Sequence, residues 1–126
     1  MTTAPFVFFD LRTADASAVR RFYTELFGWK IVDVPSGAGA APMFVADDGP
    51  WGGLTQLAEN DERKPQWIPY APVADLDEAV RRATALGATL VRGRMDLPQG
   101  SLALITDPTG ALVTLWQASE APASAR

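Results

Sequence analysis

The chain of 126 residues contains neither cysteine nor histidine. Without cysteine it forms no disulfide and offers no thiolate, and without histidine the common Ser–His and Cys–His catalytic pairs are excluded. No apolar run approaches the roughly 20 residues that a membrane helix needs, and the first residues lack the basic segment of a signal peptide. We therefore expect a cytoplasmic protein that binds no membrane.

Positive charge is also scarce, with 11 Lys and Arg against 15 Asp and Glu and a net charge of −4. Nucleic-acid binding needs clustered positive charge, so we expect no nucleic-acid partner. The short run Arg92-Gly93-Arg94 is expected at a solvated strand end. The chain also lacks the glycine-rich loops that cradle phosphates in nucleotide-binding proteins.

What the sequence does contain is an internal repeat. Residues 14–28 are echoed by residues 74–87, about 60 residues later, and each copy stands between two apolar runs. Such a repeat indicates two tandem modules. We predict an α+β fold in which helices cover the outer face of a mixed sheet that curls around a cleft. The modules are two βαβββ units, residues 6–58 and 66–117, joined by a charged linker, 59–65, and followed by a frayed tail, 118–126.

Each copy of the repeat predicts one helix. Asp15 is placed to cap the first helix, which runs to Phe27, and Gly28 follows where a left-handed C-cap is expected. Asp75 or Asp77 caps the second helix, which ends at Leu86 before Gly87. Apolar residues recur at helical spacing in the first helix and predict a buried stripe. The stripe comprises Val19, Phe22, Tyr23, Leu26 and Phe27.

Alternating apolar residues and turn signals predict four strands in each module. The first module should have strands at 6–12, 29–34, 43–46 and 54–57, and the second at 67–73, 89–92, 102–106 and 111–117. Residues 35–42, rich in Pro, Gly and Ala, are predicted to form a loop. Asp47-Asp48-Gly49-Pro50 and Asp107-Pro108-Thr109-Gly110 are turn signals.

This order of elements, together with particular residues, resembles the vicinal oxygen chelate superfamily, which includes glyoxalase I, extradiol dioxygenases and bleomycin-resistance proteins. The resemblance covers about residues 6 to 117. It rests on Leu11-Arg12-Thr13-Ala14-Asp15, on Arg21-Phe22-Tyr23-Thr24-Glu25-Leu26-Phe27-Gly28-Trp29, and on three stretches of the second module. Those stretches are Val73-Ala74-Asp75-Leu76-Asp77-Glu78-Ala79, Ala85-Leu86-Gly87-Ala88 and Asp107-Pro108-Thr109-Gly110-Ala111.

The resemblance implies a metal site that this sequence does not supply. Metal-using members draw their ligands from the first and last strand of each module. Those positions fall here on Phe8, on Gly53 or Thr55, near Ile68 and on Thr114, and none is His, Glu, Asp or Cys. A transition metal needs about three such ligands, so we expect no metal and no cofactor. An all-carboxylate site using Asp10, Asp47, Asp48 or Glu59 remains a less favoured alternative.

Ligand-binding residues are predicted by strand alternation. Asp10 and Arg12 share one face of the first strand with Phe8, and either orient a polar ligand or form a simple salt bridge. Aromatic walls with a few polar groups are typical of a pocket for an organic ligand, although such rings can also merely fill the interior. The candidate residues are Phe8, Asp10, Arg12, Trp51, Gln56, Tyr70, Thr114 and Trp116.

Three functional hypotheses follow. The favoured one is a metal-free protein that binds an aromatic or planar small molecule, as bleomycin-resistance proteins sequester antibiotics. The second is a lyase, isomerase or hydroxylase-like enzyme of the same superfamily that uses Asp10, Tyr70 or Arg12 for proton transfer. The third is a non-catalytic partner subunit. The resemblance also implies a homodimer, with the Trp51 region and residues 35–42 as candidate contact surfaces.

Overall fold

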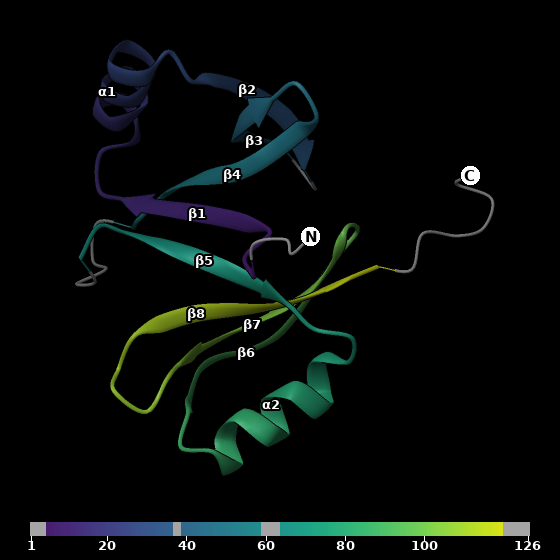
Figure 1. The fold of residues 1–126 in the computed structure, drawn as a ribbon. Coiled ribbons are helices and arrows are strands. Elements are labelled where there is room, and N and C mark those ends of the chain that lie inside the picture. Colours follow the sequence, from purple (N-terminus) through teal and green to yellow (C-terminus); the bar gives the residue numbers. More distant parts are fainter. Residues whose placement is uncertain (1–4, 37–38, 59–63, 120–126) are drawn as a thin grey trace, which may run out of the picture. The chain divides into compact units, whose positions relative to one another are not determined.

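The computed structural model describes residues 5–36, 39–58 and 64–119. The order of elements is that of two βαβββ modules, as predicted (Figure 1). The elements are β1 (Phe8–Thr13), α1 (Ala16–Phe27), β2 (Lys30–Ser36), β3 (Gly39–Ala46), β4 (Gly49–Gln56), β5 (Gln66–Pro72), α2 (Leu76–Ala85), β6 (Thr89–Leu97), β7 (Gly100–Thr106) and β8 (Leu112–Ala118). No helix in these residues is long and apolar enough to cross a membrane.

The chain divides into two compact units. The first unit is residues 8–68, and the second unit combines residues 1–7 with residues 69–126. The division falls inside β5, between Ile68 and Pro69, so its limits differ from the predicted module limits. Most of the predicted linker and tail lies outside the described residues.

The first unit holds its strands in the order β2-β3-β4-β1. β1 and β4 are parallel, with Leu11 opposite Leu54, while β2–β3 and β3–β4 are antiparallel. Leu11, Phe44 and Leu54 are buried together, and residues of α1 pack against them. The apolar face of the sheet is thereby covered by the helix of its own module.

The second unit repeats this plan, with the strand order β5-β8-β7-β6. β5 and β8 are parallel, and the other two pairs are antiparallel. Leu76 of α2 is buried against Ala103, Ile105 and Leu115. The repeat seen in the sequence is therefore a repeat of helix-on-sheet units.

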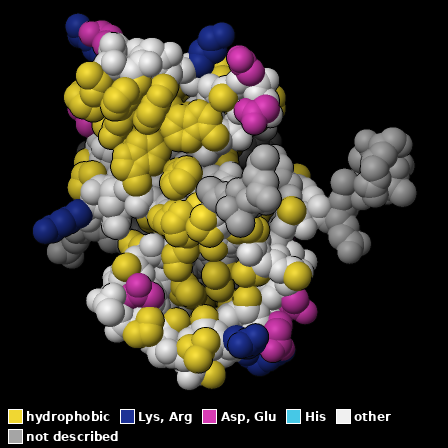
Figure 2. All heavy atoms as spheres, in the orientation of Figure 1, with side chains coloured by type: hydrophobic (Ala, Val, Ile, Leu, Met, Phe, Trp, Pro, Cys, Tyr) yellow, Lys and Arg dark blue, Asp and Glu magenta, His cyan; other side chains and the backbone are white. Residues whose placement is uncertain are grey.

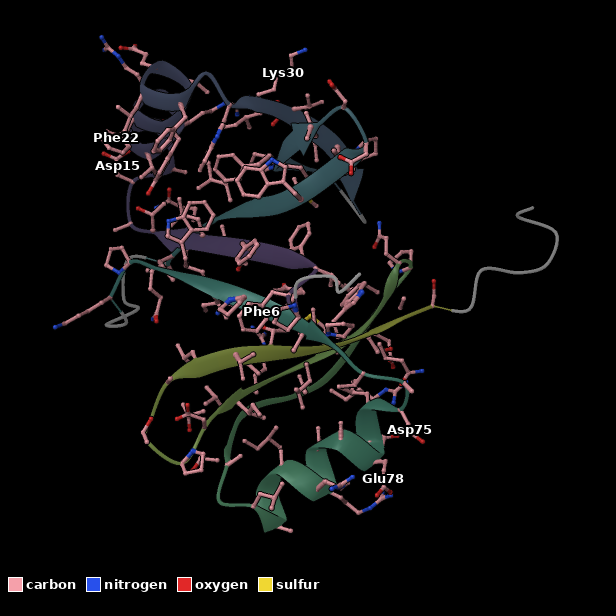
Figure 3. All side chains as sticks on the ribbon, viewed as in Figure 1. Phe6, Asp15, Phe22, Lys30, Asp75 and Glu78 are labelled. Carbon is pink, nitrogen blue, oxygen red and sulfur yellow. The ribbon has the colours of Figure 1, made fainter. Side chains whose placement is uncertain are left out.

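The ends of the helices follow the predicted capping residues. The side chain of Asp15 accepts a hydrogen bond from the Ala18 amide, and that of Asp75 accepts one from the Glu78 amide (both 3.1 Å; Figure 3). Asp75 is thus the cap of α2 rather than Asp77. Gly28 ends α1 with φ of 71°, a left-handed conformation that glycine adopts without a steric penalty.

The predicted loop at residues 35–42 is wrong. β2 continues to Ser36 and β3 begins at Gly39, and the two form an antiparallel pair. Pro42 is tolerated because β3 pairs with β4 only from Met43 onward, so a missing amide donor breaks no ladder on that side. Strand pairing outweighs the low β-propensity of the Gly and Ala residues here.

The predicted buried stripe of α1 is correct only in part. Val19 and Tyr23 are half-buried against the core, on the same line of the helix as Ala16. Phe22, Leu26 and Phe27 remain 54%, 58% and 54% exposed. Phe22 and Leu26 lie on the adjoining line, one step around the helix, which the sheet does not reach.

Candidate functional site

The face of the first unit's sheet that points away from α1 carries a group of polar side chains. Leu11 and Leu54 point toward the helix, so Asp10 and Arg12 of β1 point the opposite way, as does Thr55 of β4. The parallel register places Asp10 opposite Gly53 and Arg12 opposite Thr55. The side chains of Asp10 and Thr55, 45 residues apart in the sequence, are thereby brought together.

Asp10 is the centre of this group. One of its carboxylate oxygens accepts a hydrogen bond from the Thr55 hydroxyl and the other from Nε of Arg12, each at 2.9 Å. The side chains of Asp10 and Arg12 are only 8% and 15% exposed, whereas Thr55 is exposed. The salt bridge considered from the sequence is therefore present, and it is more buried than a rim charge would be.

Arg12 uses only part of its hydrogen-bonding capacity. Its Nε is engaged by Asp10, and its terminal nitrogens contact no acceptor within the described ranges. A guanidinium is a planar fork that can bind a carboxylate or a similar anion through two parallel hydrogen bonds. Asp10 fixes one edge of the fork and so holds Arg12 in a defined orientation. The N–H groups of the terminal nitrogens remain for a ligand.

Gly53 makes room for this arrangement. A Cβ atom at Gly53 would lie 3.2 Å from Oδ1 of Asp10 and 3.5 Å from the ring of Phe8. A side chain there would press on the Asp10 carboxylate and would be in ordinary van der Waals contact with the Phe8 ring. Gly53 and Thr55 are further functional candidates. Alternation along one strand did not show that they contact Asp10, because those contacts depend on the register between β1 and β4.

The second unit gathers three predicted residues on its own sheet. Tyr70 is paired with Thr114, and Pro72 with Trp116, so Tyr70, Thr114 and Trp116 lie on the face opposite the core of α2. The rings of Tyr70 and Trp116 are tilted, with centroids 5.9 Å apart, and Thr114 is buried. A Cβ on Gly100 would lie 2.7 Å from the Trp116 ring, so Gly100 lets that ring lie close to the backbone of β7.

Gln56 has a structural role. Its carbonyl oxygen accepts a hydrogen bond from the Ala16 amide at 2.9 Å, and its amide nitrogen donates to the carbonyls of Ala14 and Leu57. These bonds tie the end of β4 to the start of α1. Gln117 in β8 accepts a bond from the Leu76 amide at 2.7 Å in the same way. We therefore leave Gln56 out of the ligand contacts.

Trp51 lies on the helix side of the sheet. The register between β3 and β4 shifts at this point, because Phe44 pairs with Gly52 and Val45 with Pro50. Trp51 is the extra residue of this bulge, which redirects its side chain. It stacks on Phe44 with centroids 5.0 Å apart and meets Trp29 edge to face at 4.8 Å. Simple alternation along β4 does not reveal this placement.

Comparison with known proteins identifies the family. The model of the glyoxalase-like domain matches residues 6–116. The chain belongs to the glyoxalase-like domain family of the vicinal oxygen chelate superfamily. The resemblance inferred from the sequence is thereby confirmed.

Individual relatives agree with this assignment. The domain is 36% identical over 115 residues to the Mycobacterium bovis protein named "Putative glyoxylase CFP32", covering 87% of this chain and 44% of that protein. It is 32% identical over 117 residues to the anthracycline biosynthesis protein DauV of Streptomyces sp. strain C5, covering 92% of this chain and 42% of DauV. It thus spans less than half the length of both.

A solved structure shares the fold at lower identity. The V278E variant of glyoxalase I from Zea mays matches with a TM-score of 0.64 and 22% identity, over 94% of this chain and 44% of that one. At this identity the likeness shows the fold alone.

The residues at the superfamily's metal-ligand positions do not fit a metal. Phe8, Gly53 and Ile68 have no side-chain donor atom, and Thr55 and Thr114 offer only hydroxyl groups. Thr55 donates its hydroxyl to Asp10. Across the described ranges, no three His, Cys, Asp or Glu side chains are grouped so that they could hold a metal ion. The glyoxalase-like fold is therefore present without the donor set of its metal-using members.

Proposed function

We propose that this glyoxalase-like domain binds a planar aromatic small molecule that bears a carboxylate or similar anionic oxygen group, and returns it unchanged. The observation that carries the proposal is Arg12, a largely buried guanidinium oriented by Asp10 with its terminal nitrogens unengaged among the described residues. Burial strengthens a charge-assisted hydrogen bond because water screens it less.

The neighbours of Arg12 support an aromatic ligand. Phe8 lies two residues before Asp10 on the same face of β1, and its ring reaches over Gly53. A flat apolar surface beside a fixed polar group is typical of organic-ligand sites. DauV is named for anthracycline biosynthesis, and anthracyclines are planar aromatic compounds, which is consistent with a ligand of this class.

The contacts of Asp10 favour binding over proton transfer. Both of its oxygens already accept hydrogen bonds, from Arg12 and Thr55. A carboxylate held in this way orients Arg12. Asp10→Asn should therefore weaken ligand binding and not remove a reaction, because an amide holds the guanidinium less strongly than a charge does.

Calorimetric titration with anthraquinone-2-carboxylate tests the proposal. Removing a charge-assisted hydrogen bond costs about 1.5–3 kcal/mol, so Arg12→Gln should raise the Kd roughly ten- to hundredfold. Arg12→Lys, which keeps the charge but loses the fork, should fall between. Arg20→Gln is the matched control, because Arg20 is an exposed arginine of the same unit.

The neutral anthraquinone-2-carboxamide separates the anion contact from simple stacking. The wild-type domain should prefer the carboxylate, and Arg12→Gln should bind both alike. Mass spectrometry of the recovered probe should find it unaltered. Equal binding of the carboxylate by the wild type and by Arg12→Gln would refute the role of Arg12, and a converted probe would favour an enzyme.

A further inference from the structure

The hydroxyl of Thr55 has a hydrogen-bonding character that its contact with Asp10 defines. A carboxylate only accepts hydrogen bonds, so the 2.9 Å contact between Oγ1 of Thr55 and Oδ1 of Asp10 uses the hydroxyl proton of Thr55. Within the described residues this hydroxyl makes no second hydrogen bond. Its oxygen keeps its lone pairs, and Thr55 is exposed. Thr55 therefore offers a ligand an acceptor and no donor.

Arg12, on the neighbouring strand, has the opposite character. Its terminal nitrogens are donors that meet no acceptor in the described part of the chain, and a guanidinium accepts no hydrogen bond. Arg12 and Thr55 are directly paired in the register of β1 and β4, and each binds a different oxygen of the Asp10 carboxylate. Donors and an acceptor are thus held side by side, at roughly the 5 Å spacing of neighbouring strands.

The fold does not require polar side chains at these two positions. The second unit repeats the same plan, and its β5–β8 register pairs Pro72 with Trp116 where β1 and β4 pair Arg12 with Thr55. The equivalence is fixed by the glutamine that follows Thr55 and the one that follows Trp116, because each binds the first amide of the helix in its own unit. An apolar pair therefore satisfies the same place in the sheet, and the polar pair is a property of the first unit.

The surroundings of Arg12 differ from those of other charged groups in its unit. On the face that Figure 2 shows, charged side chains lie around the hydrophobic ones that gather over α1 and β2–β4. The ion pair of Arg20 and Asp33 is of the solvated kind, with side chains 41% and 57% exposed. Arg12 is only 15% exposed. Sites that hold polar groups away from water discriminate between ligands strongly, because a ligand that leaves such a group unpaired loses affinity.

We infer that this site selects aromatic carboxylates that also carry a hydroxyl meta to the carboxylate. The carboxylate binds Arg12, and the hydroxyl donates its proton to Oγ1 of Thr55. The inference rests on the proposed function, because it takes Arg12 as the group that binds the carboxylate. A meta hydroxyl suits the separation of the donors and the acceptor. An ortho hydroxyl donates to its own carboxylate and has no proton to offer, so Thr55 determines specificity by position as well as by chemistry.

Calorimetric titration with 2-naphthoate and 4-hydroxy-2-naphthoate tests the inference, since the 4-hydroxyl is meta to the carboxylate. One neutral hydrogen bond should let the wild-type domain bind the hydroxylated probe about three- to tenfold more tightly. Two further probes fix the direction and the place of this bond. 4-Methoxy-2-naphthoate cannot donate and 3-hydroxy-2-naphthoate has its hydroxyl ortho, so neither should bind more tightly than 2-naphthoate.

Substitutions of Thr55 assign the preference to its hydroxyl. Thr55→Val removes the hydroxyl with little change of shape and should bind 2-naphthoate and 4-hydroxy-2-naphthoate alike, whereas Thr55→Ser should keep the preference. If Thr55 served only to hold Asp10, Thr55→Val would weaken both probes by the same factor and leave their ratio unchanged. Thr89→Val is the matched control, because Thr89 is an exposed strand threonine in β6 of the second unit, and it should keep the wild-type ratio.

The outcomes separate this inference from the proposed function. A wild-type domain that loses affinity for 2-naphthoate on Arg12→Gln, yet shows no preference for the 4-hydroxy probe, would overturn the inference alone. A preference that survives Thr55→Val, or that the 4-methoxy probe shares, would do the same. If Arg12→Gln leaves the binding of 2-naphthoate unchanged, or if no probe binds, the proposed function fails and the inference fails with it. Circular dichroism should show all variants folded.

Discussion

Gln56 and Gln117 hold equivalent places near the ends of β4 and β8, and each accepts a hydrogen bond from the first residue of the helix in its unit. The first amides of a helix have no partner within the helix, so an outside acceptor stabilises its start. Asp15 and Asp75 satisfy a second amide at each helix. Gln56, which the sequence suggested as a ligand contact, is thus one of two equivalent glutamines that stabilise the start of a helix.

At the residue scale, Gln56→Ala and Gln117→Ala should each lower the free energy of unfolding by about 1 kcal/mol, the usual net value of one such hydrogen bond. Urea denaturation measures the change. Gln66→Ala is the control, because the side-chain hydrogen bond of Gln66 within the described residues is a 3.3 Å bond to the carbonyl of nearby Lys64. This variant should change stability by less than about 0.5 kcal/mol. If all three variants have the same free energy of unfolding, the hydrogen bonds of Gln56 and Gln117 to the helices do not stabilise the fold.

At the scale of elements, the turn between β7 and β8 depends on one carboxylate. Oδ1 of Asp107 accepts hydrogen bonds from the hydroxyl and amide of Thr109 and from the amide of Ala111, at 2.7, 2.8 and 3.1 Å. These bonds, with the Thr109 hydroxyl foremost, hold the pKa of Asp107 below its ordinary value. Charged Asp107 therefore stabilises the folded turn.

The pH dependence follows from this direction. A lowered pKa in the folded state means that the stabilisation is complete above the unfolded pKa of about 3.9 and disappears as the pH falls through the lower folded value. Asp107→Asn should be less stable than the wild type at pH 6, and the difference should shrink toward pH 2.5, as measured by urea denaturation. Asp48→Asn, in the turn between β3 and β4, controls for loss of an acidic charge. A difference that does not change with pH would contradict the role of the charge.

Elements whose signals are local could be predicted from the sequence. Asp15, Asp75 and Gly28 act within one helical turn, so their roles follow from spacing alone. The strand at residues 39–42 and the direction of Trp51 could not be predicted, because each depends on pairing with another strand. Alternation correctly placed Asp10 and Arg12 on one face. It did not identify Thr55 as their partner, since that contact needs the parallel register of β1 and β4.

The apolar periodicity of α1 did not predict which side of the helix is buried. It correctly predicted an apolar line through Phe22 and Leu26, but it cannot tell which apolar line meets the core. The sheet covers only the line of Ala16, Val19 and Tyr23. Phe22 and Leu26 on the remaining line are left more than half exposed.

At the scale of the whole molecule, the chain should bind no transition metal in stoichiometric amount. The sequence has no His or Cys, and side chains at the superfamily's ligand positions lack suitable donors. Elemental analysis of natively purified protein should find less than about 0.1 metal per chain, and added Zn²⁺ or Ni²⁺ should leave the Tm unchanged. A metal retained at full occupancy would show that ligand positions have been assigned to the wrong residues.

Three of the four tryptophans lie in the first unit, so the two units differ in tryptophan absorption and emission. Trp29, Trp51 and Trp67 form a group in the first unit with ring centroids 4.8 to 6.3 Å apart, and Trp67 donates a hydrogen bond to the Tyr23 hydroxyl at 3.1 Å. Trp116 belongs to the second unit. Indoles this close share their excited states, so the near-ultraviolet dichroism reports mainly on the first unit. The tryptophan emission of a Trp116→Phe chain would come from the first unit alone, so the folding of that half of the duplication could be followed by itself.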